Sequence, residues 1–100
     1  MKKSKAIVAR DATELAEALG LSVADGMEIE FRSDLNTKIF EVVKKKGLTH
    51  AQVAKLAKTS RTRVTALLNR NTQDISTDLM LRILGVLGVR AKVRFENTAA

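Results

Sequence analysis

Basic side chains are concentrated in the middle of the chain, where they can bind the phosphates of a polyanion. The stretch from Val42 to Gln73 contains no Asp or Glu. Its eight basic residues are Lys44, Lys45, Lys46, Lys55, Lys58, Arg61, Arg63 and Arg70. The rest of the chain carries ten basic and eleven acidic residues, so the excess positive charge lies in this stretch alone. A charge run is usually only a solvated face, but on a compact helical unit it favours a nucleic-acid partner.

The sequence offers no residues for catalysis, for metal binding or for binding a cofactor. His50 is the single histidine and cysteine is absent, which excludes thiolate zinc sites, a cysteine nucleophile and disulfides. Serine, histidine and acidic residues are present, but nothing in their order indicates a catalytic triad. The five glycines are scattered along the chain and do not form a phosphate-cradling loop. We therefore expect a protein that is not an enzyme.

The composition narrows the class of partner. One hundred residues with 45% hydrophobic composition suit a single small domain. The net charge of +7 and the pI near 10.2 predict a polyanionic partner, either nucleic acid or an acidic membrane surface. Three Phe, with no Trp or Tyr, are too few for stacking single-stranded bases. No apolar run approaches a membrane span and residues 1–5 lack the apolar core of a signal peptide, so we expect a cytoplasmic protein.

Residues 48–71, LTHAQVAKLAKTSRTRVTALLNRN, have the pattern of two short helices joined by a tight turn. Thr49 can cap the first helix together with Gln52, and Ser60 can cap the second. Only residues 58–60 lie between the helices, which predicts a sharp bend. The residues that form one apolar face on each helix are Val53, Ala54, Leu56 and Ala57 in the first and Val64, Leu67 and Leu68 in the second.

The longest predicted helix precedes this pair. It begins at Ser22 or Asp25 and ends at Lys46, before Gly47. The three lysines at its end can stabilise the negative C-terminal end of the helix dipole, and they can also contact phosphate, so both roles stay open. Its apolar residues recur at a spacing of three and four and form one stripe: Phe31, Leu35, Ile39, Val42 and Val43.

Two shorter helices are predicted near the two ends of the chain. One spans residues 11–19, with Asp11 as its cap and Gly20 as its stop, and the other spans residues 76–87, with Ser76 as its cap and Gly88 as its stop. The second of these is expected to lie mostly in the core. The apolar residues on which this expectation rests are Ile75, Leu79, Met80, Ile83, Leu84 and Leu87.

Short β-strands are predicted at both ends. Residues 90–95 alternate basic and apolar side chains, and residues 5–9 contain a β-prone run. A lone strand leaves its backbone unpaired, so residues 90–95 are expected to pair with residues 5–9, with their copy in a second chain, or with both. The basic start can alternatively lie as an arm along DNA phosphate. The expected fold class is mainly α, with about five helices; residues 1–10 form a basic tip and strand, and residues 11–100 form a single domain.

With its two helices located, residues 48–71 resemble the helix-turn-helix of the phage-repressor/Cro-like (Xre) family of bacterial DNA-binding regulators. The following helix and strand resemble the HigA-like antitoxin branch of that family, and the resemblance covers roughly residues 21–95. Ala54 matches a small residue of the motif, and Val64 and Leu67 match its buried positions. Two residues depart from it, since His50 replaces a usual Gln and Lys58 replaces a usual turn Gly. A left-handed turn at Lys58 would cost roughly 1 kcal/mol.

This resemblance implies a recognition helix at residues 60–69, lying in the major groove of DNA with its N-terminal half toward the base edges. The residue pattern agrees in part, because inward-facing Val64, Leu67 and Leu68 leave the opposite face free. Arg61 can donate two hydrogen bonds to guanine O6 and N7, and Thr or Ala can contact thymine methyl groups. The candidate base-contacting residues are Arg61, Thr62, Thr65 and Ala66.

The expected phosphate-contacting residues surround that helix. Thr49, His50, Ser60, Asn69 and Asn71 match family positions that usually hold phosphate, and Arg63 and Arg70 add charge nearby. Each has a structural alternative, because Thr49 and Ser60 can act only as caps, the two asparagines as loop residues, and Arg63 as the partner of an acid.

The resulting expectation is a homodimeric protein that binds double-stranded DNA and represses or autoregulates transcription, with two units about one DNA turn apart. The alternative is an antitoxin that neutralises a toxin protein encoded beside it, which is compatible with DNA binding. Binding to an anionic membrane surface is weaker as an explanation, because the apolar faces of the helix pair are needed for its own core.

Overall fold

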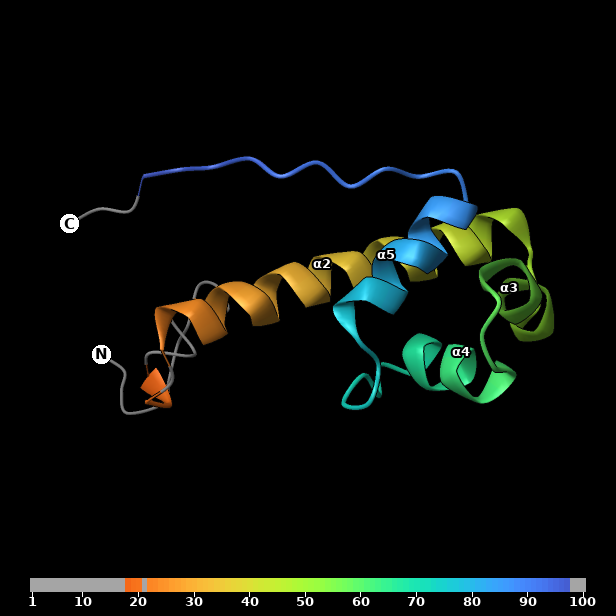
Figure 1. Ribbon diagram of the computed structural model, residues 1–100, viewed down its shortest axis with the longest axis horizontal. Helices are drawn as coiled ribbons and strands as arrows, with labels where there is room; N and C mark the ends of the chain where they lie inside the picture. The colour runs from red at the N-terminus through yellow and green to blue at the C-terminus, as the bar shows by residue number, and fades with distance from the viewer. Residues whose placement is uncertain (1–17, 21, 98–100) are drawn as a thin grey trace, which may run out of the picture.

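The computed structural model describes residues 18–20 and 22–97. Within these residues the chain forms four helices and no strand: α2 (Val23–Lys46), α3 (His50–Ala57), α4 (Arg61–Leu68) and α5 (Thr77–Val86). α3, α4 and α5 gather around the C-terminal half of α2, whose N-terminal half extends beyond them (Figure 1). No helix in this part of the chain is long and apolar enough to cross a membrane.

α2 begins at a capping box and ends at a glycine, as two of its sequence signals predict. The Ser22 Oγ accepts a hydrogen bond from the Asp25 N–H at 3.0 Å, and the Asp25 carboxylate accepts one from the Ser22 N–H at 3.2 Å. Ser22, and not Asp25, is therefore the cap. At the other end Gly47 has φ 65°, in the left-handed region that glycine adopts without steric cost.

All four helices end in the same hydrogen-bonded turn. In each, one residue adopts a left-handed conformation and the next residue donates its N–H to the carbonyl five positions earlier. These donor N–H groups belong to Leu48, Thr59, Asn71 and Val89, at 2.8–3.1 Å from their acceptors. The left-handed residues themselves are Gly47, Lys58, Arg70 and Gly88.

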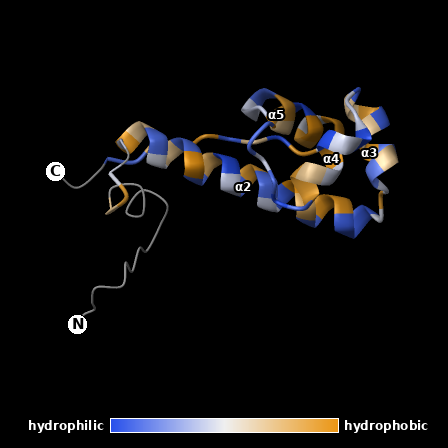
Figure 2. Ribbon diagram, turned by 90° about the horizontal axis from the view of Figure 1, so that it is seen from below, coloured by the Kyte–Doolittle hydropathy of each residue, from blue (hydrophilic) through white to orange (hydrophobic). Residues whose placement is uncertain are grey.

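One hydrophobic core joins the four helices. α2 packs against α4 and α5, and α3 packs against α4 and α5. Figure 2 shows apolar segments of the helices concentrated where they meet. The largest side chains that lose all contact with solvent come from every helix: Ile39, Val53, Val64, Leu67, Met80 and Ile83. The core faces predicted from the sequence are confirmed with two differences: Leu56 of α3 is 50% exposed, and Phe31 and Val42 of α2 are only partly buried at the edge of the core.

The predicted strand at residues 90–95 is wrong for the part of the chain that the structure describes. These residues run in an extended path back toward the N-terminal end of α2 (Figure 1), but they are not paired as a strand. The alternation of basic and apolar side chains predicts only that an extended chain would have two different faces. A β-strand also needs hydrogen bonds to the backbone of a second strand, and the pattern does not show whether one is present. Val93 and Phe95 are 64% and 91% exposed, so the predicted apolar face is not buried either.

The other N-terminal predictions fall largely outside the described residues. The strand at 5–9 and most of the helix at 11–19 lie there, so the fold seen here has four helices where about five are predicted. Only the end of that helix is described, where Gly20 has the left-handed φ of 82° predicted for its stop. The described fold is therefore all-α.

Truncation of a core residue tests this packing. We expect Ile83→Ala to lower the free energy of unfolding by about 2–5 kcal/mol, because Ile83 is fully buried between the helices. Leu81→Ala on the same helix is the matched control, since Leu81 is 39% exposed and should cost much less. Urea unfolding of both variants measures the difference; equal losses would contradict this core.

Candidate nucleic-acid interface

α3 and α4 form a bent pair whose caps are those predicted from the sequence. The Thr49 Oγ1 accepts from the Gln52 N–H at 3.1 Å, and the Gln52 side chain accepts from the Thr49 N–H at 2.8 Å. The Ser60 Oγ accepts from the Arg63 N–H at 3.1 Å. These bonds satisfy N–H groups that have no partner within their helix, so they fix where each helix begins.

The turn between the two helices contains a strained residue. Lys58 has φ 55° and ψ 49°, the left-handed conformation expected if a non-glycine residue occupies this turn. This conformation costs a residue with a Cβ about 1–2 kcal/mol. A cation at an exposed helix C-terminus returns only about 0.3–1 kcal/mol. Lys58 therefore costs more in local conformation than its charge returns through the dipole of α3.

The outer surface of α4 is polar and basic at its N-terminal end. Arg61, Thr62 and Arg63 are exposed, whereas Thr65 and Ala66 are partly buried. The inner surface is apolar, because Val64, Leu67 and Leu68 are buried. The predicted base-contacting set therefore divides into two fully accessible residues, Arg61 and Thr62, and two partly covered ones.

A hydrogen bond connects the first residue of α3 to the outer part of α4. The His50 Nδ1 lies 2.8 Å from the Thr65 Oγ1, and both residues are partly buried. One of the two groups donates and the other accepts, according to the imidazole tautomer. The sequence predicts a phosphate contact for His50 and a base contact for Thr65, and it contains no signal that the two residues bond to each other.

A buried amide holds the C-terminal end of α4. Asn36 of α2 is 4% exposed, and its Nδ2 donates to the Leu67 carbonyl at 2.8 Å. Its Oδ1 accepts from the Arg70 Nη1 at 3.2 Å, and Arg70 also donates to the Thr37 Oγ1 at 3.3 Å. Arg70 thus has an internal partner in addition to its expected phosphate contact. The neighbouring Asn69 and Asn71 are exposed.

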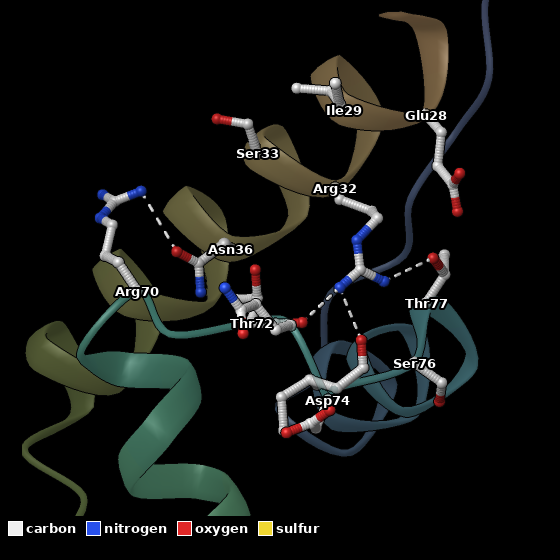
Figure 3. A pocket seen from close by; sticks show the side chains of 12 residues that line it. Glu28, Ile29, Arg32, Ser33, Asn36, Arg70, Thr72, Asp74, Ser76 and Thr77 are labelled. Carbon is white, nitrogen blue, oxygen red and sulfur yellow. Dashed lines mark hydrogen bonds between the residues drawn. The ribbon is translucent and has the colours of Figure 1, made fainter. Parts of the chain in front are cut away.

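Arg32 joins the same side of α2 to the loop between α4 and α5 and to the first residue of α5. Its guanidinium donates to the Thr77 Oγ1 at 2.9 Å and to the backbone carbonyls of Thr72 and Ile75 at 2.7 and 2.6 Å. Figure 3 shows these bonds beside the Asn36–Arg70 contact, along one open pocket. Asn36 thus holds the last turn of α4, and Arg32 holds the loop that follows it.

A structural role for Arg32 and Asn36 is not among the sequence predictions, although their position on α2 indicates one. Both stand one or two turns before Ile39 on the side of α2 that is buried, where an apolar residue is expected. A polar residue at such a position indicates a specific hydrogen-bond partner, but it does not say which one.

The basic surface is not neutralised by the rest of the described chain. The ion pairs among the described residues are Lys38–Glu41 and Arg94–Glu96, so neither involves a basic residue between 44 and 70. Lys44, Lys45, Lys46, Lys55, Lys58, Arg61 and Arg63 are all exposed. Within the described ranges, no cluster of His, Asp and Glu could hold a metal ion. This surface is suited to binding an anion.

Removal of the buried amide tests the support of α4. We expect Asn36→Ala to lower the free energy of unfolding by about 1–3 kcal/mol, because the buried Leu67 carbonyl loses its hydrogen-bond partner and the partly buried bond to Arg70 is lost as well. Ser33→Ala, an exposed position about one turn earlier on α2, should change it by less than about 0.5 kcal/mol. Thermal and urea unfolding measure both; an Asn36→Ala variant as stable as the control would contradict this support.

Comparison with known proteins agrees with the bent pair and its surroundings. A family model described as a helix-turn-helix domain matches residues 13–96. No curated protein and no solved structure matched the chain. The matched range includes all four described helices, so this chain belongs to the helix-turn-helix domain family.

Proposed function

We propose that this protein binds double-stranded DNA in a sequence-specific manner, with α4 in the major groove. The observation that carries the proposal is the exposed basic surface on the α3–α4 pair, which forms no ion pair with any residue that the structure describes. An α-helix such as α4 is about 10–12 Å in diameter with its side chains, and the major groove is about 12 Å wide, so it admits such a helix. Membership of a helix-turn-helix family supports the same partner.

Base reading is assigned first to the exposed N-terminal part of α4. Arg61 can donate two parallel hydrogen bonds to one guanine, and Thr62 can contact a thymine methyl group. Thr65 and Ala66 lie closer to the body of the protein and would meet the bases at the edge of the same contact. The His50 hydrogen bond would hold the Thr65 side chain in one rotamer for that contact.

Phosphate binding is assigned to groups on both sides of α4. Thr49 and Ser60 accept hydrogen bonds from backbone N–H groups, which leaves each hydroxyl proton free to be donated to a phosphate oxygen. The amino ends of α3 and α4 add the positive ends of two helix dipoles. His50, Arg63, Asn69, Arg70 and Asn71 complete the proposed set.

The protein is further proposed to regulate transcription as a homodimer. One short recognition helix contacts only a few base pairs, so a second copy about one DNA turn away would raise both affinity and specificity. Such a dimer bound at a promoter would act as a repressor.

A second candidate function is that of an antitoxin that also binds DNA. The observation in its favour is apolar surface outside the α3–α4 pair, notably Phe95 at 91% and Val93 at 64% exposure. A protein partner would bury such side chains. A reading frame for a small protein immediately beside this gene, whose product forms a complex with this chain, would support it; a gene without such a neighbour would count against it.

Selection from a random duplex library tests the DNA proposal. We expect enrichment of a palindromic site, and we expect Arg61→Ala to weaken binding to it by roughly 5- to 150-fold with relaxed preference at one base pair. Arg82→Ala removes an exposed charge on α5 and serves as the matched control, with little effect expected. A library without enrichment, or equal binding by the Arg61→Ala variant, would refute the proposal.

The salt dependence of DNA binding measures how many phosphate contacts the protein makes. We expect the logarithm of the binding constant to fall linearly with the logarithm of salt concentration, with a slope of about −0.9 for each phosphate contacted. Fluorescence anisotropy of a labelled duplex between 50 and 300 mM salt, roughly the range over which this effect is large, measures the slope. A flat dependence would exclude an interface built on these basic residues.

A further inference from the structure

The four helices end in the same turn, yet they do not use the same residue for it. α2 and α5 place glycine at the left-handed position, with φ of 65° at Gly47 and 86° at Gly88. α3 and α4 place a basic residue there, with φ of 55° at Lys58 and 62° at Arg70. These two are the positive-φ residues other than glycine among those that the structure describes, and they bracket α4.

The side chain of Arg70 explains its own position. Its guanidinium bonds to Asn36 and Thr37 of α2, and Asn36 in turn bonds to the last turn of α4. Glycine at this position would lose these contacts. The strained backbone is therefore compensated within the protein.

Lys58 has no such compensation in the described part of the molecule. It is exposed, and neither a hydrogen bond nor an ion pair joins its side chain to another described residue. Its attraction to the dipole of α3 is smaller than the cost of its backbone conformation. Strained residues that the fold does not require are found most often where function needs them.

The position of Lys58 indicates what that function is. It lies in the turn directly before α4, three residues ahead of Arg61, at the end of the helix where Arg61 and Arg63 are also exposed. No acidic residue occurs in the sequence between Val42 and Gln73, so this end of α4 carries charge of one sign.

We propose that Lys58 is a phosphate-contacting residue of the DNA interface, and that its left-handed backbone conformation is kept because its ammonium group binds a phosphate beside the groove that α4 enters. This inference rests on the proposed DNA binding. It predicts that stability and DNA affinity respond to the same substitution with opposite signs.

Lys58→Gly is the decisive variant, because glycine adopts the left-handed turn without steric cost and removes the charge. We expect its melting temperature to rise by about 2–8 °C, because the conformational freedom that glycine loses on folding offsets part of the relieved strain. We expect its affinity for the selected duplex to fall roughly 8-fold at about 0.1 M salt, and its salt slope to decrease by about 0.9, which is the effect of losing one phosphate contact.

Lys58→Arg is the matched control, since it keeps both the charge and the strain and should keep the affinity and the melting temperature of the natural chain. Equal affinity and equal salt slope for Lys58→Gly and the natural chain would overturn this inference while leaving DNA binding intact. So would a loss of affinity with an unchanged slope, or a Lys58→Gly variant that melts at a lower temperature. If the natural chain binds no duplex, the proposed function fails and this inference fails with it.

Discussion

The structure depends on the burial of one face of a helix that is too short to be stable alone. An isolated helix of fewer than about 12–15 residues is marginal in water, and α4 has eight. It forms because Val64 and Leu67 are fully buried against the other helices, and because Ser60 and the turn at Arg70 satisfy its terminal backbone groups. The exposed residues of α4 are therefore displayed only when the whole core is assembled.

Hydrogen bonds to α2 and α3 fix the orientation of α4, whereas burial of its apolar face stabilises it. Hydrophobic burial alone leaves a short helix free to tilt or rotate, since it has no preferred geometry. Asn36 bonds to the last turn of α4, His50 bonds to its middle, and Arg32 holds the loop that follows it. Together they hold α4 in one orientation relative to the other helices, which the proposed reading of base edges would require.

Most of the helical fold could be predicted from the sequence, because its signals are local. Caps such as Ser22, Thr49 and Ser60 and stops such as Gly47 act within a few residues of themselves. The family match supports the helix-turn-helix prediction, while the individual contact residues remain proposals. The strand at residues 90–95 was wrong because its pattern describes side-chain faces and says nothing about a pairing partner. The Asn36, Arg32 and His50 contacts join residues 15 to 45 positions apart, beyond the reach of any local rule.

The most direct test of the account is a nuclear magnetic resonance titration of the ¹⁵N-labelled full chain with a double-stranded oligonucleotide at low salt. The account predicts that backbone amide shifts change most in the first residues of α3, in the turn at residues 58–60 and in the N-terminal half of α4, and that the shifts reverse when salt is added. Changes confined to the N-terminal half of α2 and to residues 89–97, or the absence of any change in α4, would contradict it.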